Sequence, residues 1–166
     1  APQGADRRSV AETPEEAWDL VIDVNLKGTF LMCKAVIPHM LKQPRGRIVN
    51  ISSIVGKRGM AKRVAYTASK FGIVGITQTL AQELGPNGIT ANVICPGPVQ
   101  TSRFVASQKE REALAGNPKS HTLRSPPSGR FCTVEDVARM VLFVCADASD
   151  QINGQSLIVD GGDVML

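Results

Sequence analysis

The order of helical and strand-like segments constrains the fold of this chain more than any other feature of its sequence. Apolar residues recur at three- and four-residue steps in three segments, which is the pattern of an amphipathic helix. Short runs rich in β-branched residues follow these segments, and turns containing Gly or Pro separate them. The predicted order is helix 13–41, strand 48–51, helix 64–84, strand 89–95, a helix from 133, and strand 156–160. This alternation predicts an α/β fold with a parallel sheet covered by helices.

Residues at the ends of the predicted helices support these boundaries. Thr13 can cap the first helix, with Pro14 at its first position and Glu16 closing a capping box. The Gly/Pro cluster at 85–88 cannot continue the second helix. Thr133 opens the last helix in the same way as Thr13 opens the first.

Residues 102–130 form a polar segment in which prolines and glycines interrupt any helical pattern, apart from at most one short helix around 109–115. A long irregular loop in a compact domain is more often functional than not. Its basic side chains would suit a phosphate-bearing or carboxylate substrate, although exposed loops also collect such charges without a ligand. These side chains are Lys109, Arg111, Lys119, His121, Arg124 and Arg130.

The composition favours one globular domain and argues against several other classes. The chain has 166 residues, of which 43% are hydrophobic and 20% charged. No apolar run approaches the length of about 18 residues that a membrane span needs, and no signal peptide opens the sequence. The densest basic cluster, at 57–63, has no aromatic residues between its charges, so nucleic-acid binding is not expected. We therefore expect a cytoplasmic protein that binds neither membranes nor nucleic acids.

The cysteines and histidines give no indication of a metal site. The four cysteines form no Cys-x-x-Cys pair, and the two histidines are isolated. We expect reduced, mostly buried thiols. These residues are Cys33, Cys95, Cys132, Cys145, His39 and His121.

Tyr66 and Lys70 are the residues that first suggest chemistry. They lie four residues apart on the second predicted helix, so their side chains share one face. A cation near a phenol favours the phenolate and makes the hydroxyl a better proton donor and acceptor. Ser53 stands at the carboxyl end of the strand before this helix, where ligands gather in parallel sheets. Its hydroxyl could hold a carbonyl oxygen beside Tyr66, or it could simply cap a turn.

Asn25, Ser53, Tyr66 and Lys70 fall in the order and spacing of the catalytic tetrad of the short-chain dehydrogenase/reductase family, which the whole chain resembles. The segments 25–28, 48–53, 89–93, Pro96-Gly97 and 159–162 are similar to that family as well. The resemblance includes 3-oxoacyl-acyl-carrier-protein reductases and related alcohol dehydrogenases. It implies an enzyme that transfers hydride between a nicotinamide cofactor and a carbonyl or secondary alcohol. The site residues do not separate thioester reductases from polyol or alcohol dehydrogenases.

The resemblance assigns each residue of the tetrad a role. Tyr66 would donate the proton in carbonyl reduction, and Ser53 would hydrogen-bond the substrate oxygen. Lys70 would bind the ribose hydroxyls of the cofactor and favour the phenolate form of Tyr66. Asn25 would lie at a local distortion of its helix and position a water molecule that links Lys70 to solvent.

The resemblance also implies a cofactor pocket and a lid. Tyr66 and Lys70 would contact the cofactor, NAD(H) or NADP(H), and the preference between these two cannot be determined from this sequence. Residues 102–130 would cover the small-molecule substrate. The nicotinamide pocket would be lined through the backbone of Pro96, Gly97 and Val99, with Thr101 hydrogen-bonded to the carboxamide or phosphates.

The resemblance covers only part of the family's fold. No Gly-x-x-x-Gly-x-Gly fingerprint occurs, and residues 1–8 are typical of a loop within a longer protein. We therefore expect the C-terminal half of a doubly wound Rossmann-type sheet, with three strands and flanking helices. The N-terminal dinucleotide-binding half would be absent, which would leave the strand near 47–52 with one bare edge and this segment alone inactive.

Two further expectations follow for assembly. The family commonly packs its two long helices, here 13–41 and 64–85, against their copies in a dimer or tetramer. The alternative to an enzyme is a non-catalytic fragment or assembly module that keeps only these oligomerisation surfaces. Cofactor binding after restoration of the upstream residues would distinguish the two.

Overall fold

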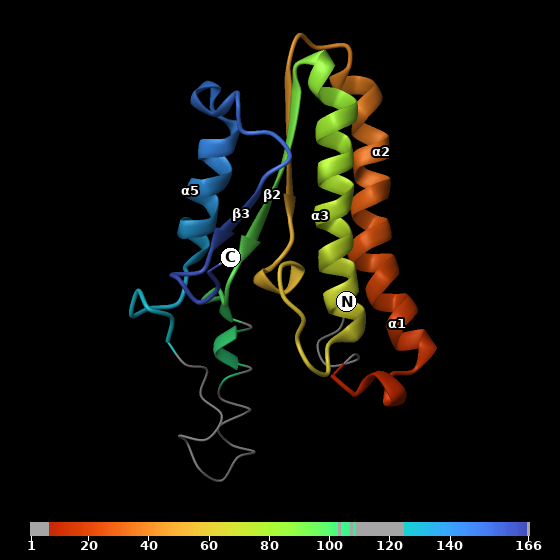
Figure 1. Cartoon of the computed structure of the whole chain (residues 1–166), viewed down its shortest axis with the longest axis vertical. Helices are drawn as coiled ribbons and strands as arrows, with labels where there is room; N and C mark the ends of the chain where they lie inside the picture. Colours follow the sequence, from red (N-terminus) through yellow and green to blue (C-terminus); the bar gives the residue numbers. More distant parts are fainter. Residues whose placement is uncertain (1–6, 103, 107, 109–124, 166) are drawn as a thin grey trace.

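The computed structural model describes residues 7–102, 104–106, 108 and 125–165, and it contains a three-stranded parallel sheet (Figure 1). The strands are β1 (Gly46–Ile51), β2 (Ile89–Pro96) and β3 (Ser156–Val159), in the order β1-β2-β3. Every residue of β2 is buried, as expected for the central strand. The predicted α/β class and the contiguous parallel arrangement of these three strands are confirmed.

The parallel register brings the carboxyl ends of the three strands to the same end of the sheet. Gly46 is opposite Ile89 in the β1–β2 pair, and Pro96 is opposite Val159 in the β2–β3 pair. Within the described residues, β1 pairs with β2 alone. Its other edge therefore carries backbone groups that no strand covers, as the sequence predicted.

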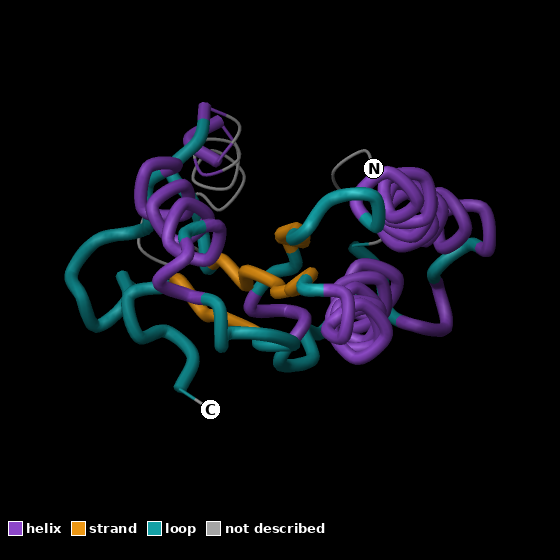
Figure 2. Tube along the Cα trace, turned by 90° about the horizontal axis from the view of Figure 1, so that it is seen from above, coloured by secondary structure: helices purple, strands orange, loops and turns teal. Residues whose placement is uncertain are grey.

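Helices cover both faces of the sheet. On one face lie α3 (Val64–Leu84) and the continuous rod made of α1 (Glu15–Ile22), a π-helical turn at Asp23–Lys27 and α2 (Gly28–Met40). On the opposite face lies α5 (Val134–Cys145), so that the sheet is sandwiched between helices (Figure 2). The bounds of α3 agree with the sequence prediction at both ends, because the Gly/Pro cluster at 85–88 stops the helix there.

The core forms where α2 and α3 meet the sheet. Cys33 of α2 and Leu80 of α3 are buried against Ile48 of β1 and Ile89 of β2. A second cluster joins Ile73 and Val74 of α3 to Val93 and Cys95 of β2. Because α3 contributes to both clusters, its position over the sheet is fixed along much of its length.

The predicted cap of the first helix is wrong. Thr13 does not cap α1, because its Oγ1 donates a hydrogen bond to the carbonyl of Ser9 at 2.8 Å. Pro14 occupies the N-cap position without a side-chain bond, so Glu16 closes no capping box with Thr13. The capping box of this region lies earlier, between Ser9 and Glu12. This capping box belongs to the 3-10 turn Val10–Glu12, which precedes α1.

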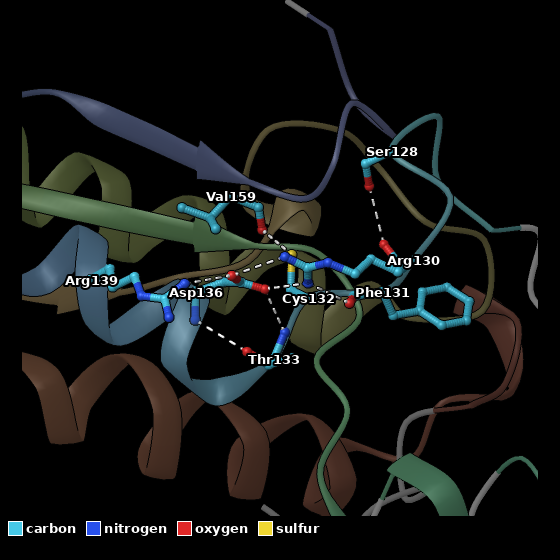
Figure 3. Close-up of polar contacts among 8 residues, drawn as sticks. All are labelled: Ser128, Arg130, Phe131, Cys132, Thr133, Asp136, Arg139 and Val159. Atoms are coloured by element: carbon cyan, nitrogen blue, oxygen red, sulfur yellow. Dashed lines mark hydrogen bonds and ion pairs between the residues drawn. The ribbon is translucent and has the colours of Figure 1, made fainter.

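The predicted cap of the last helix is confirmed (Figure 3). Thr133 Oγ1 accepts from the backbone N–H of Asp136 at 3.3 Å, and the Asp136 carboxylate accepts from the Thr133 N–H at 2.9 Å. Arg130 Nη1 also donates to that carboxylate at 2.6 Å and holds the pKa of Asp136 well below its usual range. Arg130 is thus engaged at the start of α5.

Most of the predicted lid lies outside the described residues, as does the short helix expected around 109–115. The same is true of Lys109, Arg111, Lys119, His121 and Arg124. Three of the cysteines are buried as expected, and Cys145 is exposed. No helix in the described part of the chain is both long enough and apolar enough to cross a membrane.

Candidate active site

The two serines that follow β1 have different environments. Ser52 is buried, and its Oγ donates to the backbone carbonyl of Lys70 at 2.8 Å, which ties the end of β1 to α3. Ser53 is only partly buried and opens the 3-10 turn Ile54–Gly56, where its Oγ accepts from the Val55 N–H at 3.2 Å. Ser52 is therefore structural, whereas Ser53 presents a hydroxyl at the edge of the sheet where ligands are expected.

Tyr66 lies directly beside this turn. Its side chain packs against the cluster formed by Ile54, Val55 and Val164, the first two of which belong to the turn that Ser53 opens. The structure therefore brings Ser53 and Tyr66 to the same place, although thirteen residues separate them in sequence. The loop that follows β3 supplies Val164, the third member of this cluster.

Lys70 lies one helical turn after Tyr66. Its Nζ is 5.7 Å from the centroid of the Tyr66 ring and donates to the carbonyl oxygen of Ile51 at 3.1 Å. Burial lowers the pKa of Lys70, and a weaker interaction with Cys95 opposes this effect. The ammonium group is thus held at the carboxyl end of β1, within electrostatic reach of the phenol.

Asn25 reaches this group from the π-helical turn. Its Nδ2 donates to Ser69 Oγ at 3.2 Å, and that hydroxyl donates in turn to the carbonyl of Tyr66 at 2.8 Å. The extra residue of a π turn releases a backbone carbonyl from the helical ladder. Here Thr29 Oγ1 donates to the Asn25 carbonyl at 2.7 Å. Asn25 therefore lies at a distortion of its helix, as the resemblance implied, and is linked through Ser69 to the turn of α3 that carries Tyr66.

Arg63 is a neighbour of Tyr66 that the sequence reasoning missed. It occupies the N-cap position of α3 without a side-chain capping bond, and its guanidinium carbon lies 4.7 Å from the centroid of the Tyr66 ring. The sequence placed Arg63 in a solvated basic loop. Its spacing of three residues before Tyr66 is no clear signal, because Arg63 precedes the helix and its backbone is not helical, with φ at −143° and ψ at 38°.

Pro96 ends β2, and Gly97 follows it at the carboxyl end of the sheet. Pro96 is buried, and the Gly97 N–H donates to the Val159 carbonyl at 2.9 Å. A Cβ at Gly97 would lie 2.7 Å from Asp160 Cβ and 3.1 Å from its Cα, so a larger residue would push these two strand ends apart. The glycine keeps the backbone of β2 and β3 close together at the site.

Val99 and Thr101 begin the segment that leads away from the sheet. Val99 forms an isolated parallel bridge with Cys132. Thr101 is exposed, and its Oγ1 accepts from the backbone N–H of Phe104 at 3.2 Å. The structure thus gives the Thr101 hydroxyl a capping contact, and no described contact joins it to Tyr66 or Lys70.

Asp160 shapes the loop that packs on Tyr66. One carboxylate oxygen accepts from the Gly162 N–H at 2.8 Å, and the other accepts from the Val164 N–H at 2.7 Å. Both Gly161 and Gly162 have positive φ angles, at 71° and 88°, which glycine adopts without strain. The described residues contain no group of three or more His, Cys, Asp or Glu side chains that could hold a metal ion.

Comparison with known proteins finds similar sequences over most of the chain. A family model described as enoyl-(acyl carrier protein) reductase matches residues 2–163. The chain is 41% identical over 151 residues to the 3-oxoacyl-(acyl-carrier-protein) reductase FabG of Thermotoga maritima, covering 91% of this chain and 58% of the relative. It is 38% identical over 157 residues to the probable galactose dehydrogenase GalD of Rhizobium meliloti, covering 95% and 59%.

Solved structures agree with these relatives. Sorbitol-6-phosphate 2-dehydrogenase SrlD from Erwinia amylovora superposes with a TM-score of 0.89 at 31% identity, covering 96% of this chain and 65% of that one. An oxidoreductase of the short-chain dehydrogenase/reductase family from Burkholderia thailandensis gives a TM-score of 0.81 at 32% identity, covering 95% and 60%. The chain spans somewhat less than two thirds of the length of these proteins.

Proposed function

The chain belongs to the short-chain dehydrogenase/reductase family, and on that premise we propose that the complete protein is an NAD(P)(H)-dependent oxidoreductase that interconverts a carbonyl and a secondary alcohol. The observation that carries the proposal is the grouping of Tyr66, Lys70 and Ser53 at the carboxyl end of β1. A phenol beside a cation, next to a hydroxyl at a strand end, is an arrangement suited to proton transfer at a substrate oxygen.

The residues present fit the nicotinamide and ribose part of such a cofactor. The Lys70 ammonium carries three N–H donors, and one of them meets the Ile51 carbonyl, so further donors can reach ribose hydroxyls. Because residue 97 is a glycine that lies close to Asp160, no side chain projects from the backbone directly after β2. We assign Tyr66, Lys70 and Thr101, with the backbone of Pro96, Gly97 and Val99, to cofactor binding. The bound cofactor would supply or accept the hydride.

The side chains of this chain would then carry out the proton transfer. In carbonyl reduction, Tyr66 donates its hydroxyl proton to the substrate oxygen, while Ser53 donates a hydrogen bond to the same oxygen. Lys70 stabilises the phenolate that Tyr66 leaves behind. Asn25 is joined to α3 through Ser69 and orders the path by which a proton returns to the site.

The complete protein is expected to form a homodimer or homotetramer. Large apolar side chains are exposed along the π turn and α2, and contiguous exposure of this kind marks an association surface. They include Val24 at 50%, Phe30 at 48%, Leu31 at 50% and Met32 at 66% exposure. Light scattering from the complete protein would detect the oligomer, and a monomer would contradict this expectation.

Isotope transfer tests the proposed reaction. The complete protein is incubated with a panel of carbonyl compounds and NADH or NADPH deuterated at the transferable position, and products are examined by mass spectrometry. We expect one deuterium at the carbinol carbon of the product and stoichiometric cofactor oxidation. A Ser53→Ala variant should lower the rate, whereas Thr79→Val, which removes an exposed hydroxyl from α3, should not. Alcohol formation without deuterium transfer would refute the proposal.

A further inference from the structure

Ser69 lies between Tyr66 and Lys70 on α3 and is completely buried, with 0% of its surface exposed. Its Oγ donates to the backbone carbonyl of Tyr66 at 2.8 Å and accepts from Asn25 Nδ2 at 3.2 Å. A serine within a helix often donates to a carbonyl of the preceding turn, so the first bond alone is an ordinary local contact. The second bond is different, because it joins α3 to the π turn of the neighbouring helical rod.

An apolar contact holds the same π turn against α3 one helical turn further along. A Cβ at Gly72 would lie 2.7 Å from Leu26 Cδ1 and 2.8 Å from its Cδ2, so a larger residue there would displace the leucine. Gly72 lies three residues after Ser69 and therefore shares its helical face. Packing thus places the backbone of the π turn beside α3, and Ser69 contacts the side chain of Asn25.

The two hydrogen bonds of Ser69 determine the orientation of the Asn25 amide. A hydroxyl has one hydrogen to donate, and Ser69 donates it to the Tyr66 carbonyl. Its oxygen can then only accept, so the amide turns its nitrogen, and not its oxygen, toward Ser69. Because Oδ1 and Nδ2 are bonded to the same carbon, Asn25 Oδ1 is directed away from Ser69. The Asn25 side chain therefore presents its acceptor oxygen in one fixed direction.

We propose that Ser69 is a positioning residue of the reaction, whose hydroxyl sets the orientation of the Asn25 amide and so fixes the acceptor with which Asn25 orders the returning proton. Ser69 contacts no reacting atom and acts only through Asn25. Without the hydroxyl, the amide can turn either way, and a fraction of the molecules then present a donor where an acceptor is needed. This inference rests on the proposed oxidoreductase function.

Ser69→Ala in the complete protein tests the proposal, because it removes the hydroxyl and leaves the rest of the side chain in place. We expect kcat for carbonyl reduction to fall by about threefold to tenfold, the effect of one net hydrogen bond. KM and the dissociation constant of NAD(P)H should stay as in the wild type. The solvent deuterium isotope effect on kcat should rise, since return of the proton then limits more of the turnover. An unchanged kcat and isotope effect would overturn the proposal.

A double-mutant cycle with Asn25→Ala shows whether Ser69 acts through Asn25. Asn25→Ala should lower kcat by itself. Adding Ser69→Ala to that variant should then change neither kcat nor the isotope effect, because the amide that Ser69 orients is already gone. If the two losses multiplied instead, Ser69 would act independently of Asn25 and the proposal would be wrong.

Thr77→Val is the matched control for loss of a buried hydroxyl. Thr77 is also buried on α3, where its Oγ1 donates to the Ile73 carbonyl at 2.7 Å and accepts from Asn50 Nδ2 at 2.9 Å. This variant should lose stability to urea much as Ser69→Ala does, without a rise in the isotope effect. An equal rise in both variants would contradict the specific role of Ser69. A wild type that reduces no carbonyl would remove the oxidoreductase proposal itself, whereas equal reduction by the wild type and Ser69→Ala would remove only this inference.

Discussion

Replacing Asp160 by Asn should destabilise the protein and loosen the active site together. Asp160 is 5% exposed, and its two oxygens accept from Gly162 and Val164 at 2.8 and 2.7 Å. Asparagine keeps one acceptor oxygen and replaces the other with an amide nitrogen, which can only donate. One of the two backbone N–H groups then faces a donor in a buried turn. Because Val164 belongs to the cluster that packs on Tyr66, the displacement should reach the phenol.

The magnitude follows from the bonds that are lost. A hydrogen bond to a charged acceptor contributes about 1.5–3 kcal/mol, and a buried donor left without a partner costs about 1–3 kcal/mol. Both figures refer to the same lost hydrogen bond, so they are not added together. The hydrogen bond that remains is also weaker, because its acceptor no longer carries a charge. We therefore expect the free energy of unfolding to fall by about 2–4 kcal/mol.

Urea unfolding of the complete protein, followed by circular dichroism, measures this change. Asp163→Asn is the matched control, because Asp163 lies three residues away and makes one partly exposed ion pair with Arg58. Such pairs contribute about 0–1 kcal/mol. If Asp160→Asn lowered the stability no more than Asp163→Asn, the structural role given to the Asp160 carboxylate would be wrong.

Three other substitutions test separate parts of the structure. Lys70→Ala should lower both turnover and cofactor affinity in the complete protein, and an unchanged dissociation constant for NAD(P)H by fluorescence titration would exclude its double role. Gly97→Ala should weaken cofactor binding, because its Cβ meets the backbone of Asp160, whereas Gly59→Ala meets nothing within 4 Å and should bind normally. Thr133→Ala should lower the free energy of unfolding by about 1 kcal/mol through loss of the α5 cap, and unaltered urea unfolding would contradict that role.

Much of the fold could be predicted from the sequence because its signals are local. The apolar periodicity of 64–84 and the Gly/Pro cluster after it fix both ends of α3. The parallel sheet follows from the alternation of helices and strands, and the strand ends then bring Ser53 toward Tyr66. By contrast, Thr13 misled the prediction of the first cap, since a hydroxyl can equally donate to a carbonyl four residues earlier.

The parts that escaped prediction depend on the backbone path. The resemblance implied only a local distortion of the helix at Asn25. The apolar pattern did not indicate the π turn Asp23–Lys27, because one extra residue in a helix scarcely alters that pattern. Arg63 looked like one of several charges in a loop. Its place over Tyr66 depends on the positive φ angle of Lys62, which no local composition reveals.

The role of Tyr66 as proton donor is the central claim, and Tyr66→Phe in the complete protein tests it most directly. The change removes the hydroxyl and keeps the ring, so contacts with Ile54, Val55 and Val164 should survive. The measurement is single-turnover oxidation of bound NAD(P)H by a carbonyl substrate, together with the dissociation constant of the cofactor. We predict a rate lower by about a hundredfold to ten-thousandfold, the usual contribution of a general acid, with cofactor binding close to the wild type. A rate equal to that of the wild type would contradict the account.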